Sequence, residues 1–201
     1  MITEKKTKES TKEKVLSGLV WTFGERILAQ GVSFILSIIL ARMLLPSEYG
    51  IIAMIMVFIN IANVFTSTGF GESLVQKKNA DELDFSSVFF CTFSLSIIIY
   101  GILFVCAPYI EVFYRVEGIT LVLRVLSLKI VLSSIATVQH AYVQKYMLFR
   151  KFFFSTLGGT LVSGIVGIVL AYIGFGVWAL VVQYLTNTII DILVLLFTVS
   201  W

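Results

Sequence analysis

The sequence has 201 residues, of which 58% are hydrophobic and only 13% are charged, with a formal net charge of +3. A soluble domain of this length cannot bury so much apolar surface, whereas a bilayer accepts it, so the composition indicates a membrane protein. There is no basic stripe with interleaved aromatic residues, which argues against a nucleic-acid partner. One histidine and two cysteines argue against a metal site, and we expect no cofactor.

Six long apolar runs follow a charged N-terminal tail, residues 1–14. Crossing about 30 Å of hydrocarbon takes about 20 helical residues, and each run is long enough. Only helices and closed barrels satisfy the backbone in lipid, and these runs are too long and continuous for barrel strands. The expected fold is therefore all-α, a bundle of six transmembrane helices. The predicted spans are 15–40, 49–70, 85–107, 119–147, 152–173 and 177–199.

Lysine and arginine are distributed unevenly between the two sides of this predicted bundle. The tail, the second loop and the fourth loop together carry ten of them, whereas the other loops carry only Arg42 and Arg115. Cytoplasmic loops are enriched in Lys and Arg. The pattern predicts a multi-pass plasma-membrane (inner-membrane) protein with both termini in the cytoplasm.

Polar residues recur at helical spacing within four of the six predicted spans. In the first, Arg26, Gln30, Ser33 and Ser37 are spaced by 4, 3 and 4 residues and so share one helix face. An ionised group at mid-bilayer costs about 2.5–3.5 kcal/mol, so such a face is expected to meet another helix or to line water. The later polar faces carry Asn60, Asn63 and Ser67, then Lys129, Ser133, Thr137, His140 and Gln144, and finally Gln183, Asn187 and Asp191.

Two interpretations of these polar faces stay open. Amides and hydroxyls such as those of Asn60 and Asn63 also tie helices together by hydrogen bonds. The charged groups favour a hydrated cavity, and a cationic cavity suggests an anionic cargo such as a phosphate or pyrophosphate. The candidate cavity residues are Arg26, Gln30, Asn60, Asn63, Lys129, His140, Gln183, Asn187 and Asp191.

The fifth predicted span carries small residues instead, at every fourth position from Ser155 to Ala171. The intervening members are Gly159, Ser163 and Gly167. A ridge of small residues lets two helix backbones approach closely. We therefore predict that this face packs against another helix and is not a ligand site.

Five stretches in order resemble the polysaccharide exporters of the multidrug/oligosaccharidyl-lipid/polysaccharide superfamily, the Wzx-type flippases. The similarity is greatest to the colanic-acid and teichuronic-acid exporter branch. It covers nearly the whole chain after the tail. The stretches are "LARMLLPSEYGIIAM" (40–54), "STGFGESLVQKKNADELDFSSVFF" (67–90), "APYIEVFY" (107–114), "AYVQKYMLFRKF" (141–152) and "GFGVWALVVQYL" (174–185).

This resemblance implies a transporter that flips an undecaprenyl-pyrophosphate-linked oligosaccharide or polysaccharide repeat unit by alternating access through a cationic lumen. Arg26 and Lys129 would suit its pyrophosphate. Members of the family have two six-helix lobes, so residues 15–201 are expected to form the N-terminal lobe, completed by a second lobe or a homodimer. Alternatives are a cation-coupled drug antiporter and a truncated, non-transporting membrane protein. An enzyme is not expected, since HExxH and G-x-S-x-G motifs are absent.

Overall fold

The computed structural model describes residues 24, 27–67, 70–77, 81–146 and 149–198. This described part is helical, without strands. It begins with a first helix, Ile27–Met43. The helices that follow are α2 (Pro46–Ser67), α3 (Phe70–Gln76), α4 (Glu82–Tyr114), α5 (Ile119–Leu126), α6 (Leu128–Lys145), α7 (Phe149–Ile173) and α8 (Val177–Thr198).

Five helical stretches in the described residues are long and apolar enough to cross a membrane, which confirms an all-α, multi-pass membrane bundle. For the first predicted span, the described helix Ile27–Met43 is apolar but shorter, and residues 15–23 lie outside the described part. The five stretches are Pro46–Gln76, Leu83–Tyr114, Ile119–Lys145, Ser155–Ile173 and Val177–Phe197.

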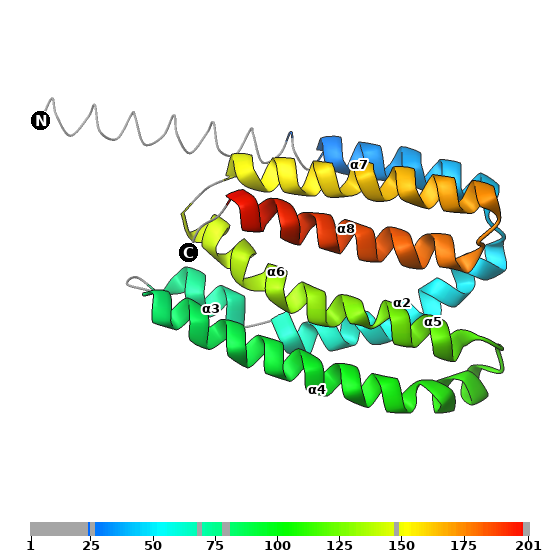
Figure 1. Cartoon of the computed structure of the whole chain (residues 1–201), viewed down its shortest axis with the longest axis horizontal. Coiled ribbons are helices and arrows are strands. Elements are labelled where there is room, and N and C mark those ends of the chain that lie inside the picture. The colour runs from blue at the N-terminus through cyan, green and yellow to red at the C-terminus, as the bar shows by residue number, and fades with distance from the viewer. Residues whose placement is uncertain (1–23, 25–26, 68–69, 78–80, 147–148, 199–201) are drawn as a thin grey trace, which may run out of the picture.

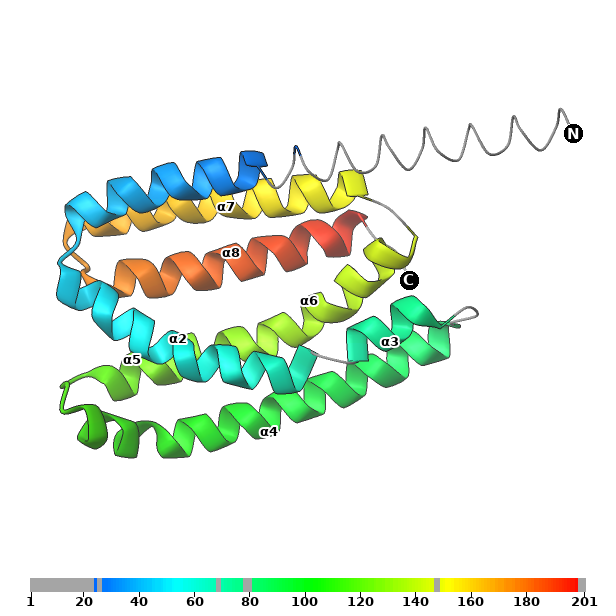
Figure 2. The same cartoon turned by 180° about the vertical axis from the view of Figure 1, so that it is seen from behind.

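Helix α8 lies at the centre of the arrangement, between α7 on one side and α6 on the other (Figures 1 and 2). The first helix packs on α7, where the side chain of Leu36 fills the space beside Gly164. Helices α2, α4, α5 and α6 form the other part of the bundle, with α3 against α6 and α4. Residues 49, 129 and 184, which are far apart in sequence, lie on the three neighbouring helices α2, α6 and α8.

Aliphatic side chains from α2, α5, α6 and α8 fill the main core, which includes Ile55, Ile59, Leu123 and Ile130. Large apolar side chains also cover much of the outer surface, and Phe197 is 89% exposed. In water such a surface would be unfavourable, but lipid solvates it. The bundle is thus apolar both inside and outside, as expected for a membrane protein.

Three features differ from the predicted spans. The run predicted as 119–147 is divided into α5 and α6 at Ser127, a residue with helical φ and ψ whose hydroxyl donates to the Leu123 carbonyl at 2.6 Å. Helix α4 is longer than predicted. It begins at a capping box formed by Asp81 and Asp84 and ends at Arg115, which has φ of 55°. Helix α3, in the loop predicted after residue 70, was not expected.

The connections sort to two ends of the bundle (Figures 1 and 2). The turn into α2 and the α4–α5 and α7–α8 connections share one end, where the Glu48 carboxylate lies directly against Gly176. At the opposite end Lys145 donates from Nζ to the carbonyls of Lys77 at 2.7 Å and Leu74 at 3.3 Å, and so caps α3. These ends match the predicted grouping of loops, while the orientation in the membrane stays a prediction.

Candidate functional site

The first candidate site is built around Lys129, the second residue of α6, which lies inside a membrane-spanning stretch. Its Nζ lies 5.0 Å from the centroid of the Tyr184 ring on α8, within range of a cation–π interaction. Within the described part of the chain, no carboxylate forms an ion pair with this amine. A half-buried ammonium group without a counter-ion can accept an anion.

Two tyrosines from neighbouring helices complete this first site. Tyr49 of α2 and Tyr184 of α8 both pack against the main core, on helices that contact each other. The Tyr49 hydroxyl is buried, and no described residue forms a hydrogen bond with it. An ammonium group and two phenolic hydroxyls are all able to donate hydrogen bonds to an anionic oxygen. We call Lys129, Tyr49 and Tyr184 the Lys129 cluster.

The tyrosines of this cluster were missed by the sequence reasoning. The polar face of the sixth span was traced through Gln183, and Tyr184 lies about 100° further round the helix. A second polar stripe of the same span consists of Tyr184, Thr188 and Asp191, spaced by 4 and 3 residues. This spacing would have identified Tyr184 as a candidate. Tyr49 stands alone at the start of α2, and no spacing pattern marks it.

The second candidate site brings together His140 of α6, Asp191 of α8 and Ser155 of α7. Nε2 of His140 lies 2.8 Å from Oδ2 of Asp191, with side chains 26% and 19% exposed. The Ser155 hydroxyl donates to Oδ1 of Asp191 and to its carbonyl oxygen at 3.1 Å. We call these three residues the His140 cluster. His140 lies eleven residues beyond Lys129 on α6, a rise of about 16 Å, so the two clusters sit at different depths.

The remaining polar residues of α8 face the small residues of α7. Asn187 donates from Nδ2 to the Ser163 hydroxyl at 3.3 Å, and Gly159 lies against the Asn187 backbone. Gly167 lies against the side chain of Gln183. Here the structure gives the polar face of α8 contacts with the ridge of α7.

The other described candidate residues lie on the first helix and on α2. Gln30 on the first helix and Asn60 on α2 are exposed. Asn63 is half-buried, and its backbone carbonyl accepts a hydrogen bond from the Thr66 hydroxyl at 3.2 Å. Arg26 lies outside the described residues. The role of these four residues in a cavity stays a prediction.

No metal site is found in the part of the chain that the structure describes, where no three His, Cys, Asp or Glu residues could hold an ion together. The two clusters offer a cation, phenols, a hydroxyl and one imidazole–carboxylate pair. These groups are suited to binding and positioning a ligand through charge and hydrogen bonds.

The sequence model of the family described as "Polysaccharide biosynthesis protein" matches residues 39–201. The chain therefore belongs to this family. No solved structure matches the chain.

The chain is similar to several curated proteins over most of its length. It is 25% identical over 160 residues to the succinoglycan biosynthesis transport protein ExoT of Rhizobium meliloti (strain 1021), covering 80% of this chain and 32% of that protein. It is 22% identical over 142 residues to the lipopolysaccharide biosynthesis protein WzxC of Escherichia coli (strain K12), covering 71% and 29%. It is 25% identical over 148 residues to the teichuronic acid biosynthesis protein TuaB of Bacillus subtilis (strain 168), covering 74% and 30%. The chain spans about a third of the length of these relatives.

Proposed function

We propose that this member of the polysaccharide biosynthesis protein family exports an anionic, lipid-linked oligosaccharide or polysaccharide repeat unit across the plasma membrane. Its relatives are described as proteins of succinoglycan, lipopolysaccharide and teichuronic acid biosynthesis, and one of them as a transport protein. The cargo would be linked to undecaprenyl pyrophosphate. Its charged head would travel between helices while its prenyl tail stays in lipid.

The observation that carries this proposal is the Lys129 cluster. Its ammonium group lies in a spanning helix, is half-buried, and has no ion pair within the described chain. Such a group is costly in a membrane, and ionisable residues that are found there mark ion or substrate pathways. A pyrophosphate would supply the counter-charge and would accept hydrogen bonds from Lys129, Tyr49 and Tyr184.

Transport would follow from alternating access. In this mechanism the six-helix lobe rocks against a second lobe, or against another copy of the chain, around a binding site deep in the membrane. The second wall would cover the faces that carry the exposed Gln30 and Asn60.

A binding experiment tests the charge requirement directly. The protein in lipid nanodiscs is titrated with undecaprenyl pyrophosphate and with undecaprenol, which lacks the phosphates. We expect Lys129→Ala to weaken pyrophosphate binding about 10- to 100-fold, the value of a charge-assisted hydrogen bond, and Lys129→Arg to retain it. Neither change should alter undecaprenol binding.

Arg124 provides the matched control, because it is another cation on the same spanning stretch. Its Nε donates to the Phe104 carbonyl at 3.2 Å, and its guanidinium lies 4.1 Å from the centroid of the Phe104 ring. Arg124→Ala should leave pyrophosphate binding unchanged. Equal affinity of wild type and Lys129→Ala would refute the site. Binding of lipophilic cations that depends on Asp191 would instead favour a cation-coupled drug antiporter.

Export itself is tested in cells that produce the protein. Chromosomal Lys129→Ala is expected to leave lipid-linked repeat units in the inner leaflet and to lower surface polysaccharide, with Arg124→Ala as the control. Normal surface polysaccharide in the Lys129→Ala strain would contradict the proposal.

A further inference from the structure

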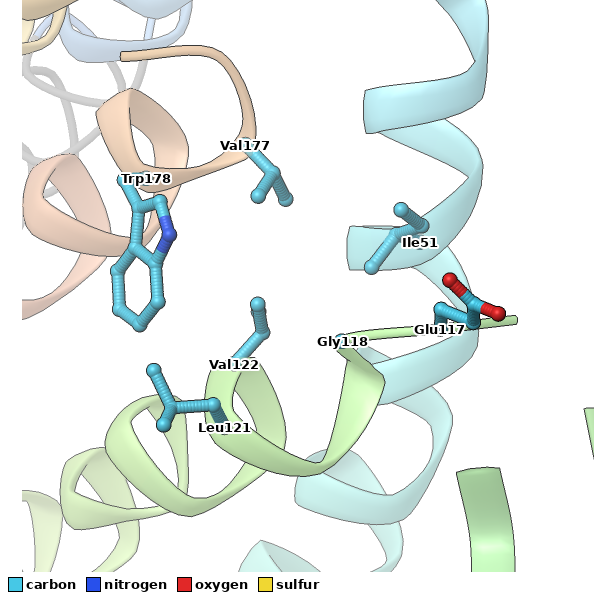
Figure 3. A pocket seen from close by; sticks show the side chains of 7 residues that line it. All are labelled: Ile51, Glu117, Gly118, Leu121, Val122, Val177 and Trp178. Atoms are coloured by element: carbon cyan, nitrogen blue, oxygen red, sulfur yellow. The ribbon is translucent and has the colours of Figure 1, made fainter. Parts of the chain in front are cut away.

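A cavity of about 230 Å³ lies at the end of the bundle that carries the α4–α5 and α7–α8 connections, outside both polar clusters (Figure 3). Its walls are the apolar side chains of Ile51 from α2, Val122 from α5 and Val177 from α8. Leu121 lines it too and is 58% exposed, so the cavity opens at the surface of the bundle. This position is near a membrane–water interface if the spanning helices cross the bilayer.

Two polar groups border the apolar walls. The indole of Trp178 turns its nitrogen toward the space between the side chains, and the carboxylate of Glu117 stands at the edge (Figure 3). Among the described residues, none accepts a hydrogen bond from this indole nitrogen and none forms an ion pair with Glu117. One donor and one anion are thus available to an occupant of the cavity.

These groups define the chemistry of the occupant. The carboxylate repels anionic headgroups and attracts an ammonium group that can donate hydrogen bonds. The indole N–H can donate to an ester or phosphate oxygen, as tryptophan does at membrane interfaces. The aliphatic walls fit the first methylenes of an acyl chain, since ligand cavities are mostly apolar with a few placed polar groups.

We propose that this cavity binds a phospholipid with a primary-amine headgroup, of the phosphatidylethanolamine class, from the leaflet at this end of the bundle. The lipid would join the ends of α2, α5 and α8. This site is independent of the proposed cargo, because Glu117 would repel a pyrophosphate.

Fluorescence quenching tests the site, because Trp178 is one of three tryptophans in the chain. The other two are replaced by phenylalanine, and the protein is reconstituted in phosphatidylcholine bilayers. Lipids brominated in the acyl chain near the headgroup are then added with an ethanolamine, choline or glycerol headgroup. Brominated phosphatidylethanolamine should quench Trp178 about threefold more strongly at equal fraction, the preference expected for a partly exposed ion pair.

The choline lipid is the sharpest comparison, because its ammonium has the same charge but no N–H donors. Comparing the ethanolamine and choline lipids requires no substitution in the cavity, so this test can be made even if a cavity variant fails to insert into the membrane. Glu117→Gln should abolish the preference for ethanolamine, and Glu117→Asp should keep it.

Filling the cavity supplies a second test. Leu121→Phe should reduce quenching by all brominated lipids, whereas Ile173→Phe, an exposed position outside the cavity lining, should not. Equal quenching by the ethanolamine and choline lipids would overturn the headgroup assignment. Quenching that is unchanged in Leu121→Phe would overturn occupancy of the cavity.

Discussion

The contact between α7 and α8 can be tested by substituting two adjacent glycines of α7. A Cβ atom added at Gly159 would lie 3.2 Å from the backbone oxygen of Asn187 and 3.6 Å from its Nδ2. A Cβ atom added at Gly158 would have no atom of another residue within 4 Å, outside the backbone of its own helix. Alanine should therefore be tolerated at Gly158 and resisted at Gly159.

The expected size follows from two opposing effects on the free energy of unfolding. Replacing a helical glycine by alanine is worth about 1 kcal/mol in helix propensity, and this gain applies to both positions. Overpacking costs about 1–3 kcal/mol and applies only at Gly159, where α8 must move by a few tenths of an ångström. Gly159→Ala should therefore be less stable than Gly158→Ala by about 1–3 kcal/mol.

The free energy of unfolding is measured in mixed micelles by titrating a mild detergent with a denaturing one and following helicity by circular dichroism. Gly158→Val and Gly159→Val repeat the comparison with a larger side chain and should widen the gap. If both alanine variants gain stability equally, the ridge is not in close contact with α8, and the predicted packing role of Gly159, Ser163 and Gly167 is wrong.

Three further predictions concern charged groups. A double-mutant cycle on His140 and Asp191, using Gln and Asn, should give a coupling free energy of about 1 kcal/mol, and additive effects would contradict the pair. Lys145→Met should speed amide hydrogen exchange in α3 about tenfold, because it removes the contacts of Lys145 with the carbonyls of Leu74 and Lys77. Lys77→Met leaves both contacts intact and should not speed it. Equal exchange rates in the two variants would contradict the cap. With the two native cysteines replaced, Arg115→Cys should react with an impermeant thiol reagent added outside and Lys77→Cys should not, and the reverse result would invert the predicted orientation.

The sequence was sufficient for the helices, because transfer of apolar residues to lipid is a large, local effect. It was insufficient where small local bonds decide. The division between α5 and α6 at Ser127 falls inside a continuous apolar run, where composition marks no boundary. Helix α3 has only seven residues and is held by Lys145, which is 68 residues from Lys77.

The candidate site could be predicted only by helix face. Periodicity shows that Lys129 and His140 share a face of one helix, but not how that helix is rotated against its neighbours. Asp191 was expected in a cavity, and its contact with His140, 51 residues away, needed the structure. The tyrosines of the Lys129 cluster are amphipathic and carry no charge. The free-energy cost of burying a charge in the bilayer, which pointed to Lys129, therefore does not point to them.

The two clusters should separate binding from rigidity. The His140 cluster joins the three helices α6, α7 and α8, so its loss should loosen the bundle without removing the cation that would meet the cargo. Lys129 makes no ion pair among the described residues and meets α8 through the cation–π contact with Tyr184, so its loss should remove the cation and loosen the bundle less than loss of the His140 cluster does.

Asp191→Asn is therefore expected to lower the thermal unfolding temperature while keeping the affinity for undecaprenyl pyrophosphate. Lys129→Ala is expected to weaken this affinity with a smaller change in the unfolding temperature. Both quantities are measured on the same nanodisc samples, at temperatures where each variant is folded. Should Asp191→Asn weaken pyrophosphate binding as much as Lys129→Ala does, the clusters would form one extended site, and the His140 cluster would belong to the cargo pathway.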